Sequence, residues 1–163
     1  LEVNTRVQVE HPVTEMITGV DIVQEQIRVA AGEPLSVTQD QIKVNGHAIE
    51  CRINAEDPDR NFMPQAGLIE TFDPPGGLGV RVDTHARAGY RIPPNYDSMI
   101  GKLIVHAPTR DQAIARMQEA LRQFRIGPMK TSIGLHRRML DRPEFKTANF
   151  DIKWVEHWLA GQA

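Results

Sequence analysis

The chain has 163 residues, of which 40% are hydrophobic and 25% are charged, and its formal net charge is −2. This composition is typical of an ordinary globular domain and includes no basic run, which argues against a nucleic-acid partner. No apolar stretch approaches the roughly 20 residues of a membrane-spanning helix, so we expect no membrane association. The single cysteine excludes an internal disulfide and a Cys-rich zinc site, and we expect a cytoplasmic location.

The first ten residues alternate apolar and polar side chains, which predicts a strand with one buried face. The polar positions are Glu2, Asn4, Arg6, Gln8 and Glu10. Carboxylates and amides around a guanidinium suit a metal-bound anionic substrate, and the alternative is a plain strand whose polar face only meets water. The chain begins without Met inside this segment, so we expect a fragment that carries half of a site.

Two helices are expected to follow and to form one wall of that site. A turn is predicted at 11–12, because the residue before a proline disfavours helical geometry. A short helical turn is expected over 14–19. Asp21 then predicts a capped helix start, with Gln24 reaching back to it, and the Gly and Pro within 32–34 end this helix.

The centre of the chain, from residue 33 to about 108, has the pattern of an antiparallel β-sheet. Strands are predicted at 47–55, 67–72, 79–85 and 98–107, separated by turns rich in Pro and Gly. In the first of them, one face carries Ile49, Cys51 and Ile53 and the other carries Glu50, Arg52 and Asn54. Cys51 is therefore expected to be an inert core residue.

Helices return after the sheet. Thr109 and Gln112 have the spacing of a capping box, and the following apolar stripe predicts a helix that stops at Gly127-Pro128. Further short helices are predicted at 131–140 and 152–159. The order of helices, a β-meander and helices predicts an α+β fold with a mainly antiparallel sheet flanked by helices.

Three features have residue types suited to chemistry, and the plain alternative for Glu10 and His11 is a surface pair. Glu2 and Asn4 form E-x-N, whose oxygens suit a hard cation such as Mg²⁺, and Glu10 is a base candidate beside an imidazole. Arg52 can bind a carboxylate-like anion through its forked guanidinium. The alternative for Arg52 is a structural ion pair with Glu50 or Asp57.

Three motifs carry a resemblance over nearly the whole chain: 2–15 (EVNTRVQVEHPVTE, followed by ITGVD), 46–57 (GHAIECRINAED) and 94–102 (PNYDSMIGK). They resemble the biotin carboxylase family, of the type that serves bacterial acetyl-CoA carboxylase and fatty-acid synthesis. Carbamoyl-phosphate synthetases and purine carboxylases share E-x-N but not VEHPVTE. The resemblance implies that 1–32 end an ATP-grasp domain and that 33–163 form a biotin carboxylase C-terminal domain.

The resemblance also implies a role for each polar residue of the opening segment. Glu2 and Asn4 would hold Mg²⁺ or Mn²⁺ on ATP, while Arg6, Gln8, the Val9 backbone and Glu10 would surround bicarbonate. Glu10 would be the general base, Arg6 would stabilise carboxyphosphate, and Arg52 would bind the ureido oxygen of biotin. ATP, bicarbonate and biotin on a carrier protein are thus the implied substrates.

The partners implied are a biotin carboxyl carrier protein, a carboxyltransferase and the upstream ATP-grasp regions of the same polypeptide. Without those regions we expect the chain alone to be inactive. The alternative is a non-catalytic assembly module of a propionyl-CoA, methylcrotonyl-CoA or pyruvate carboxylase. In that interpretation Leu78, Arg81 and Asp97 would contribute to a homodimer interface, although Leu78 replaces the aromatic residue of some relatives.

Overall fold

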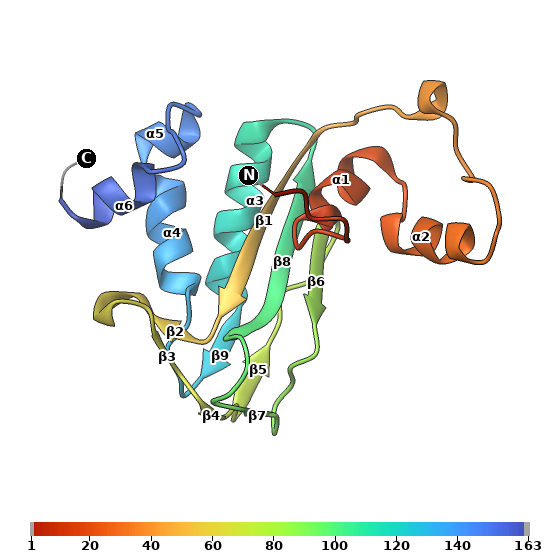
Figure 1. The fold of residues 1–163 in the computed structure, drawn as a ribbon. Coiled ribbons are helices and arrows are strands. Elements are labelled where there is room, and N and C mark those ends of the chain that lie inside the picture. The colour runs from red at the N-terminus through yellow and green to blue at the C-terminus, as the bar shows by residue number, and fades with distance from the viewer. Residues whose placement is uncertain (1, 162–163) are drawn as a thin grey trace.

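A three-stranded antiparallel sheet forms the centre of the computed structural model, which describes residues 2–161. Its strands lie in the order β1 (His47–Asn54), β8 (Met99–Ala107) and β6 (Val80–Thr84). The alternation of apolar and polar residues along β1 gives the sheet two chemically different faces. Figure 1 shows helices on both faces of this sheet.

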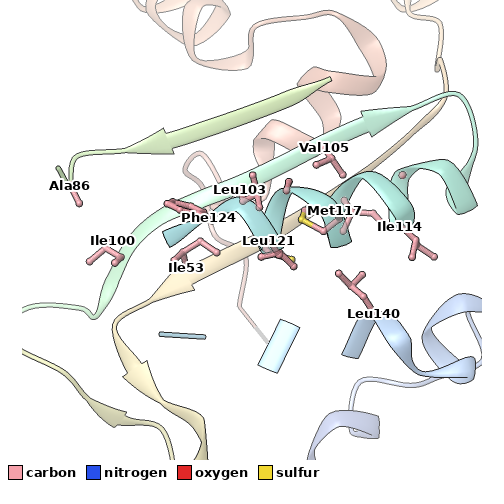
Figure 2. Packing of buried hydrophobic residues seen from close by; sticks show 14 of the residues in the cluster. Ile53, Ala86, Ile100, Leu103, Val105, Ile114, Met117, Leu121, Phe124 and Leu140 are labelled. Carbon is pink, nitrogen blue, oxygen red and sulfur yellow. The ribbon is translucent and has the colours of Figure 1, made fainter. Parts of the chain in front are cut away.

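The apolar face packs against helix α3 (Arg110–Gln123). Ile53 and Leu103 from the sheet and Met117 from α3 are all 0% exposed. Figure 2 shows their side chains interleaved between the strands and the helix. Burial of each such side chain contributes about 1.5–3 kcal/mol, so this layer is the main source of stability. Helix α4 (Ile133–Asp141) packs beside α3.

The opposite face is covered in part by helix α1 (His11–Thr18), which contacts β1 and β8. Ile104 lies on this face and is 0% exposed. Its cross-strand neighbours are the charged Glu50 and Arg81. Helix α2 (Ile22–Ala30) then leads away from the sheet, and a long connection returns to β1 (Figure 1). This second face is therefore where polar groups gather under a partial cover.

The remaining elements are short and surround the end of the sheet. Three two-stranded pairs occur among the described residues: β2 (Glu56–Asp57) with β3 (Met63–Pro64), β4 (Gly67–Leu68) with β7 (Arg91–Ile92), and β5 (Thr71–Asp73) with β9 (Arg125–Gly127). Turns of 3-10 helix lie at Gln39–Gln41 and Pro58–Arg60, and helices α5 (Pro143–Lys146) and α6 (Trp154–Leu159) end the described chain. None of the helices within 2–161 is long and apolar enough to cross a membrane.

The predicted α+β fold is confirmed. The predicted strands at 47–55, 79–85 and 98–107 correspond to β1, β6 and β8, and Cys51 is buried on the apolar face. The predicted helix starts are also confirmed, because Asp21 Oδ1 accepts a hydrogen bond from Gln24 N at 2.8 Å and Thr109 Oγ1 accepts one from Gln112 N at 3.3 Å.

Two predictions for the sheet and the start of the chain are wrong. The strand expected at 67–72 is two strands, β4 and β5. Ile69 N donates a hydrogen bond to the Tyr90 carbonyl, whereas Glu70 N donates one to the Gly127 carbonyl, so the backbone changes partner between these two residues. Residues 2–10 form no strand, since no described strand pairs with them, and Val3 is 86% exposed. The helix after them begins at His11 instead of residue 14, with Pro12 in its first turn, where the missing N–H is not needed.

Candidate active site

The fold brings together two residues that the sequence separates by 42 positions, Glu10 and Arg52. Glu10 directly precedes α1, and Arg52 projects from β1 on the same face of the sheet. Arg52 Nη2 lies 3.5 Å from Glu10 Oε2, with the two side chains 56% and 62% exposed. An exposed ion pair stabilises a protein by about 0–1 kcal/mol, so this one leaves both groups available to a ligand. The alternative interpretation of Arg52, an ion pair with Glu50 or Asp57, is wrong, because the ion pair of Arg52 within the described residues is with Glu10.

The backbone beneath Arg52 is held by helix α4. Ser132 Oγ and His136 Nε2 each donate a hydrogen bond to the Arg52 carbonyl at 2.8 Å. Ser132 Oγ also accepts a hydrogen bond from Asn54 N at 3.0 Å. Burial lowers the pKa of His136, which favours the neutral ring that donates through one nitrogen. Sequence patterns missed both residues, because their contact with β1 spans about half of the chain.

The segment before α1 is held by a lysine that lies in one of the sequence motifs but had no expected role. Lys102 Nζ donates a hydrogen bond to the Val9 carbonyl at 2.9 Å. His11 Nδ1 donates to the Gln8 carbonyl at 2.8 Å, and the Gln8 amide reaches the Asn4 carbonyl at 3.3 Å. The segment is therefore folded back on itself and tied to β8.

The other predicted ligands of this segment lie in water. Glu2, Asn4 and Arg6 are exposed, and the hydrogen bond that Arg6 makes runs to its neighbour Val7 at 3.2 Å. A carboxylate and an amide oxygen fit the hard-oxygen preference of Mg²⁺. Within residues 2–161 no three His, Cys, Asp or Glu side chains are grouped to hold a metal ion. Glu2 and Asn4 could thus supply only part of a coordination shell.

Glu50 adds a half-buried carboxyl group to this face of the sheet, with its Oε2 atom buried. Its Oε2 has no hydrogen-bond partner within the described residues. Burial raises the pKa of Glu50, and the nearby charges of Lys102 and Arg52 oppose that rise without cancelling it. The alternation of β1 placed Glu50 on the polar face, but it gave no sign of this burial.

The residues predicted at a dimer interface lie in different surroundings. Leu78 is 93% exposed, and Asp97 accepts a hydrogen bond from Met99 N at 2.7 Å. Arg81 is engaged within the chain, where its guanidinium lies 2.7 Å from both Glu15 and Asp83. A role for the three residues in an interface stays a prediction.

Comparisons with known proteins identify the family of the chain. Residues 50–157 match the biotin carboxylase C-terminal domain, and residues 1–38 match the ATP binding domain of the carbamoyl-phosphate synthase L chain. The chain belongs to the biotin carboxylase family. The two matched stretches are separated by residues 39–49, and the predicted domain boundary after residue 32 stays a prediction.

Curated relatives of this family match almost the whole chain. A biotin carboxylase of Nostoc sp. is 56% identical over 96% of the chain, and biotin carboxylase 1 of Bacillus subtilis is 54% identical over 96%. The chain spans 35% of each of these two proteins. It thus corresponds to about one third of a biotin carboxylase.

A solved structure has the same fold. The dimeric biotin carboxylase domain of Hydrogenobacter thermophilus 2-oxoglutarate carboxylase, in complex with MgADP, ADP and bicarbonate, is 50% identical, with a TM-score of 0.92. The match covers 96% of this chain and 35% of that one.

Proposed function

We propose that this chain is part of an ATP-dependent ligase that carboxylates biotin with bicarbonate, the first half-reaction of a biotin-dependent carboxylase. The observation that carries the proposal is the pairing of Glu10 with Arg52 at 3.5 Å on an open face of the sheet. A carboxylate and a guanidinium at this separation offer a proton acceptor and an anion-binding donor to one small substrate. The similarity to a biotin carboxylase domain in complex with MgADP and bicarbonate supports this choice of ligands.

In the proposed mechanism Glu10 accepts the proton of bicarbonate, whose oxygen attacks the γ-phosphorus of ATP. The bond to the bridging oxygen breaks, which gives carboxyphosphate and ADP. Arg6, the Gln8 amide and the Val9 N–H surround the bicarbonate, and Arg6 then stabilises carboxyphosphate. Carboxyphosphate breaks down to CO₂ and phosphate, and the phosphate takes the ureido proton of biotin before the biotin nitrogen captures CO₂.

Arg52 stabilises the negative charge that develops on the ureido oxygen of biotin. Preorganised donors act most strongly where charge accumulates and water is excluded. Mg²⁺ or Mn²⁺ held by Glu2 and Asn4 would neutralise charge on the phosphates of ATP. Because the chain spans 35% of the Nostoc relative, we propose that catalysis requires the other regions of the parent polypeptide and that this chain alone is inactive.

The test is ATP cleavage that depends on both bicarbonate and free biotin, measured on the full-length parent. Arg52→Ala is expected to lower carboxylation about 100- to 1,000-fold while leaving the KM for ATP nearly unchanged. Glu10→Gln is expected to suppress bicarbonate-dependent ATP cleavage. Arg125→Ala is the matched control, because Arg125 forms an exposed ion pair with Asp73 at 3.0 Å, and it should keep full activity.

Two results would contradict the proposal. A parent protein whose ATP cleavage does not depend on biotin would be a ligase with another acceptor. Equal losses of ATP binding and carboxylation in Arg52→Ala would remove its assigned role at biotin. We also propose that the parent works in the cytoplasm with two partners. A carrier protein brings carboxybiotin to a carboxyltransferase, and the carboxyltransferase selects the acyl-CoA or keto-acid acceptor.

A second candidate function is assembly, and the exposure of Leu78 favours it. The Hydrogenobacter thermophilus domain is a dimer, and Leu78, which is 93% exposed next to β6, is an apolar side chain that a second copy of the chain could cover. Leu78→Glu is expected to convert a dimer to a monomer in sedimentation of the parent protein while leaving the Glu10–Arg52 pair in place. An unchanged mass would exclude Leu78 from the interface.

A further inference from the structure

Lys102 is placed between the two halves of the candidate site. It lies on β8 directly opposite Arg52 of β1 in the register of the sheet, so both side chains project from the same face. Arg52 reaches Glu10, and Lys102 reaches the carbonyl of Val9, the residue before Glu10. One cross-strand pair of basic residues thus contacts two consecutive residues of the opening segment.

The burial of the Lys102 side chain is not explained by charge pairing alone. It is only 12% exposed, and its closest acceptor is the Val9 carbonyl at 2.9 Å. Its distance to Asp83 Oδ2 is longer, 3.7 Å, and Asp83 already receives two hydrogen bonds from Arg81, at 2.7 and 2.8 Å. Burying an ammonium group is costly unless it is hydrogen-bonded, so the bond to Val9 explains why the lysine is tolerated here.

A hydrogen bond to this carbonyl constrains more than one atom. The Val9 carbonyl and the Glu10 N–H belong to one planar peptide unit, so fixing the oxygen orients the whole unit. The Glu10 side chain leaves from the next Cα. The donor on Lys102 therefore sets where the Glu10 carboxylate lies relative to Arg52.

We propose that Lys102 is a positioning residue, which holds the Val9–Glu10 peptide against β8 so that Glu10 faces Arg52, without itself contacting substrate. This inference rests on the proposed function. Misplacing a reacting group by about 1 Å can cost on the order of 100-fold in rate, even when the residue that is changed never touches the substrate.

The test compares three variants of the full-length parent. Lys102→Met removes the donor while keeping a long apolar stem, Lys102→Arg restores a donor, and Asp83→Asn removes the ion pair while leaving the Val9 bond in place. Bicarbonate-dependent turnover is expected to fall about 10- to 100-fold in Lys102→Met through kcat, with the KM for ATP unchanged. Lys102→Arg should recover most of the loss, and Asp83→Asn should stay near wild type.

A second readout is independent of activity. Hydrogen exchange of residues 2–10, followed by mass spectrometry, is expected to rise in Lys102→Met and to stay low in Lys102→Arg and Asp83→Asn. Unchanged exchange in Lys102→Met overturns the inference whether or not the parent carboxylates biotin. Faster exchange with unchanged kcat also overturns it, because loss of the Lys102 hydrogen bond would then loosen residues 2–10 without slowing catalysis. A wild-type parent without biotin-dependent cleavage contradicts the proposed function instead, and the exchange data still decide whether Lys102 holds the segment.

Discussion

Glu15 is a buried carboxylate that joins three elements, and its removal should destabilise the domain strongly. It lies in α1 with a side chain that is 8% exposed. Its Oε1 accepts a hydrogen bond from Ile22 N at 2.9 Å, at the start of α2, and its Oε2 accepts one from Arg81 Nη1 at 2.7 Å, from β6. Losing a hydrogen bond to a charged group costs about 1.5–3 kcal/mol, and leaving a buried N–H unsatisfied costs about 1–3 kcal/mol.

We expect Glu15→Ala to lower the free energy of unfolding by about 3 kcal/mol. The value lies at the low end of the range of about 3–5 kcal/mol for breaking a buried pair, because Arg81 keeps Asp83 as a partner and is 34% exposed. Urea unfolding of the chain, followed by tryptophan fluorescence and circular dichroism, measures the change. With a slope of about 2 kcal/mol per molar urea, the midpoint should fall by about 1.5 M.

Glu33→Ala is the matched control for this measurement. Glu33 pairs with Arg28 at 2.9 Å, but its side chain is 53% exposed. Its removal should cost about 1 kcal/mol at most. If Glu15→Ala shifted the midpoint no more than Glu33→Ala, the reasoning that burial makes the Glu15 contacts strong would be refuted.

Two further predictions concern titratable groups on β1 whose pKa is raised by burial. Burial raises the pKa of Glu50, so the folded state favours the protonated carboxyl group. The stability that this protonated group contributes is therefore lost as the pH rises through the folded pKa. Glu50→Gln should therefore stabilise the chain in urea at pH 7.5, with a gain that shrinks below the ordinary value of 4.5; a loss at pH 7.5 would contradict this. Burial raises the pKa of the Cys51 thiol from 9.0 to about 12, so an aromatic disulfide reagent at pH 8 should label the folded chain about 1,000-fold more slowly than the urea-unfolded chain. Similar labelling rates would show that Cys51 is accessible in the native state.

Much of the fold was predictable because local patterns carry it. The alternation along 47–55 identified one strand of the central sheet and its apolar face, and the turns rich in Pro and Gly helped to delimit the strand at 98–107. Side chains at Asp21 and Thr109 marked two helix starts, since each one caps backbone N–H groups of its own first turn. These signals act over a few residues and need no knowledge of the rest of the chain.

The same kind of pattern was misleading for residues 2–10. Their alternation is as regular as that of β1, yet they form no strand, because a strand also needs a neighbour to bond its N–H and C=O groups. Whether such a neighbour exists is a property of the tertiary structure. The alternation predicted an apolar face that another element would bury, but Val3 on that face is 86% exposed.

The amino-acid sequence by itself determined the fold class, the strands of the central sheet, the main helices and the family. The tertiary structure alone decided which polar groups meet. Glu10 faces Arg52 across 42 residues, and Lys102 holds Val9 across 93. The physical reason is that periodicity assigns a side chain to a face of its own element, whereas cross-strand register and helix docking decide which side chains from distant elements share that face.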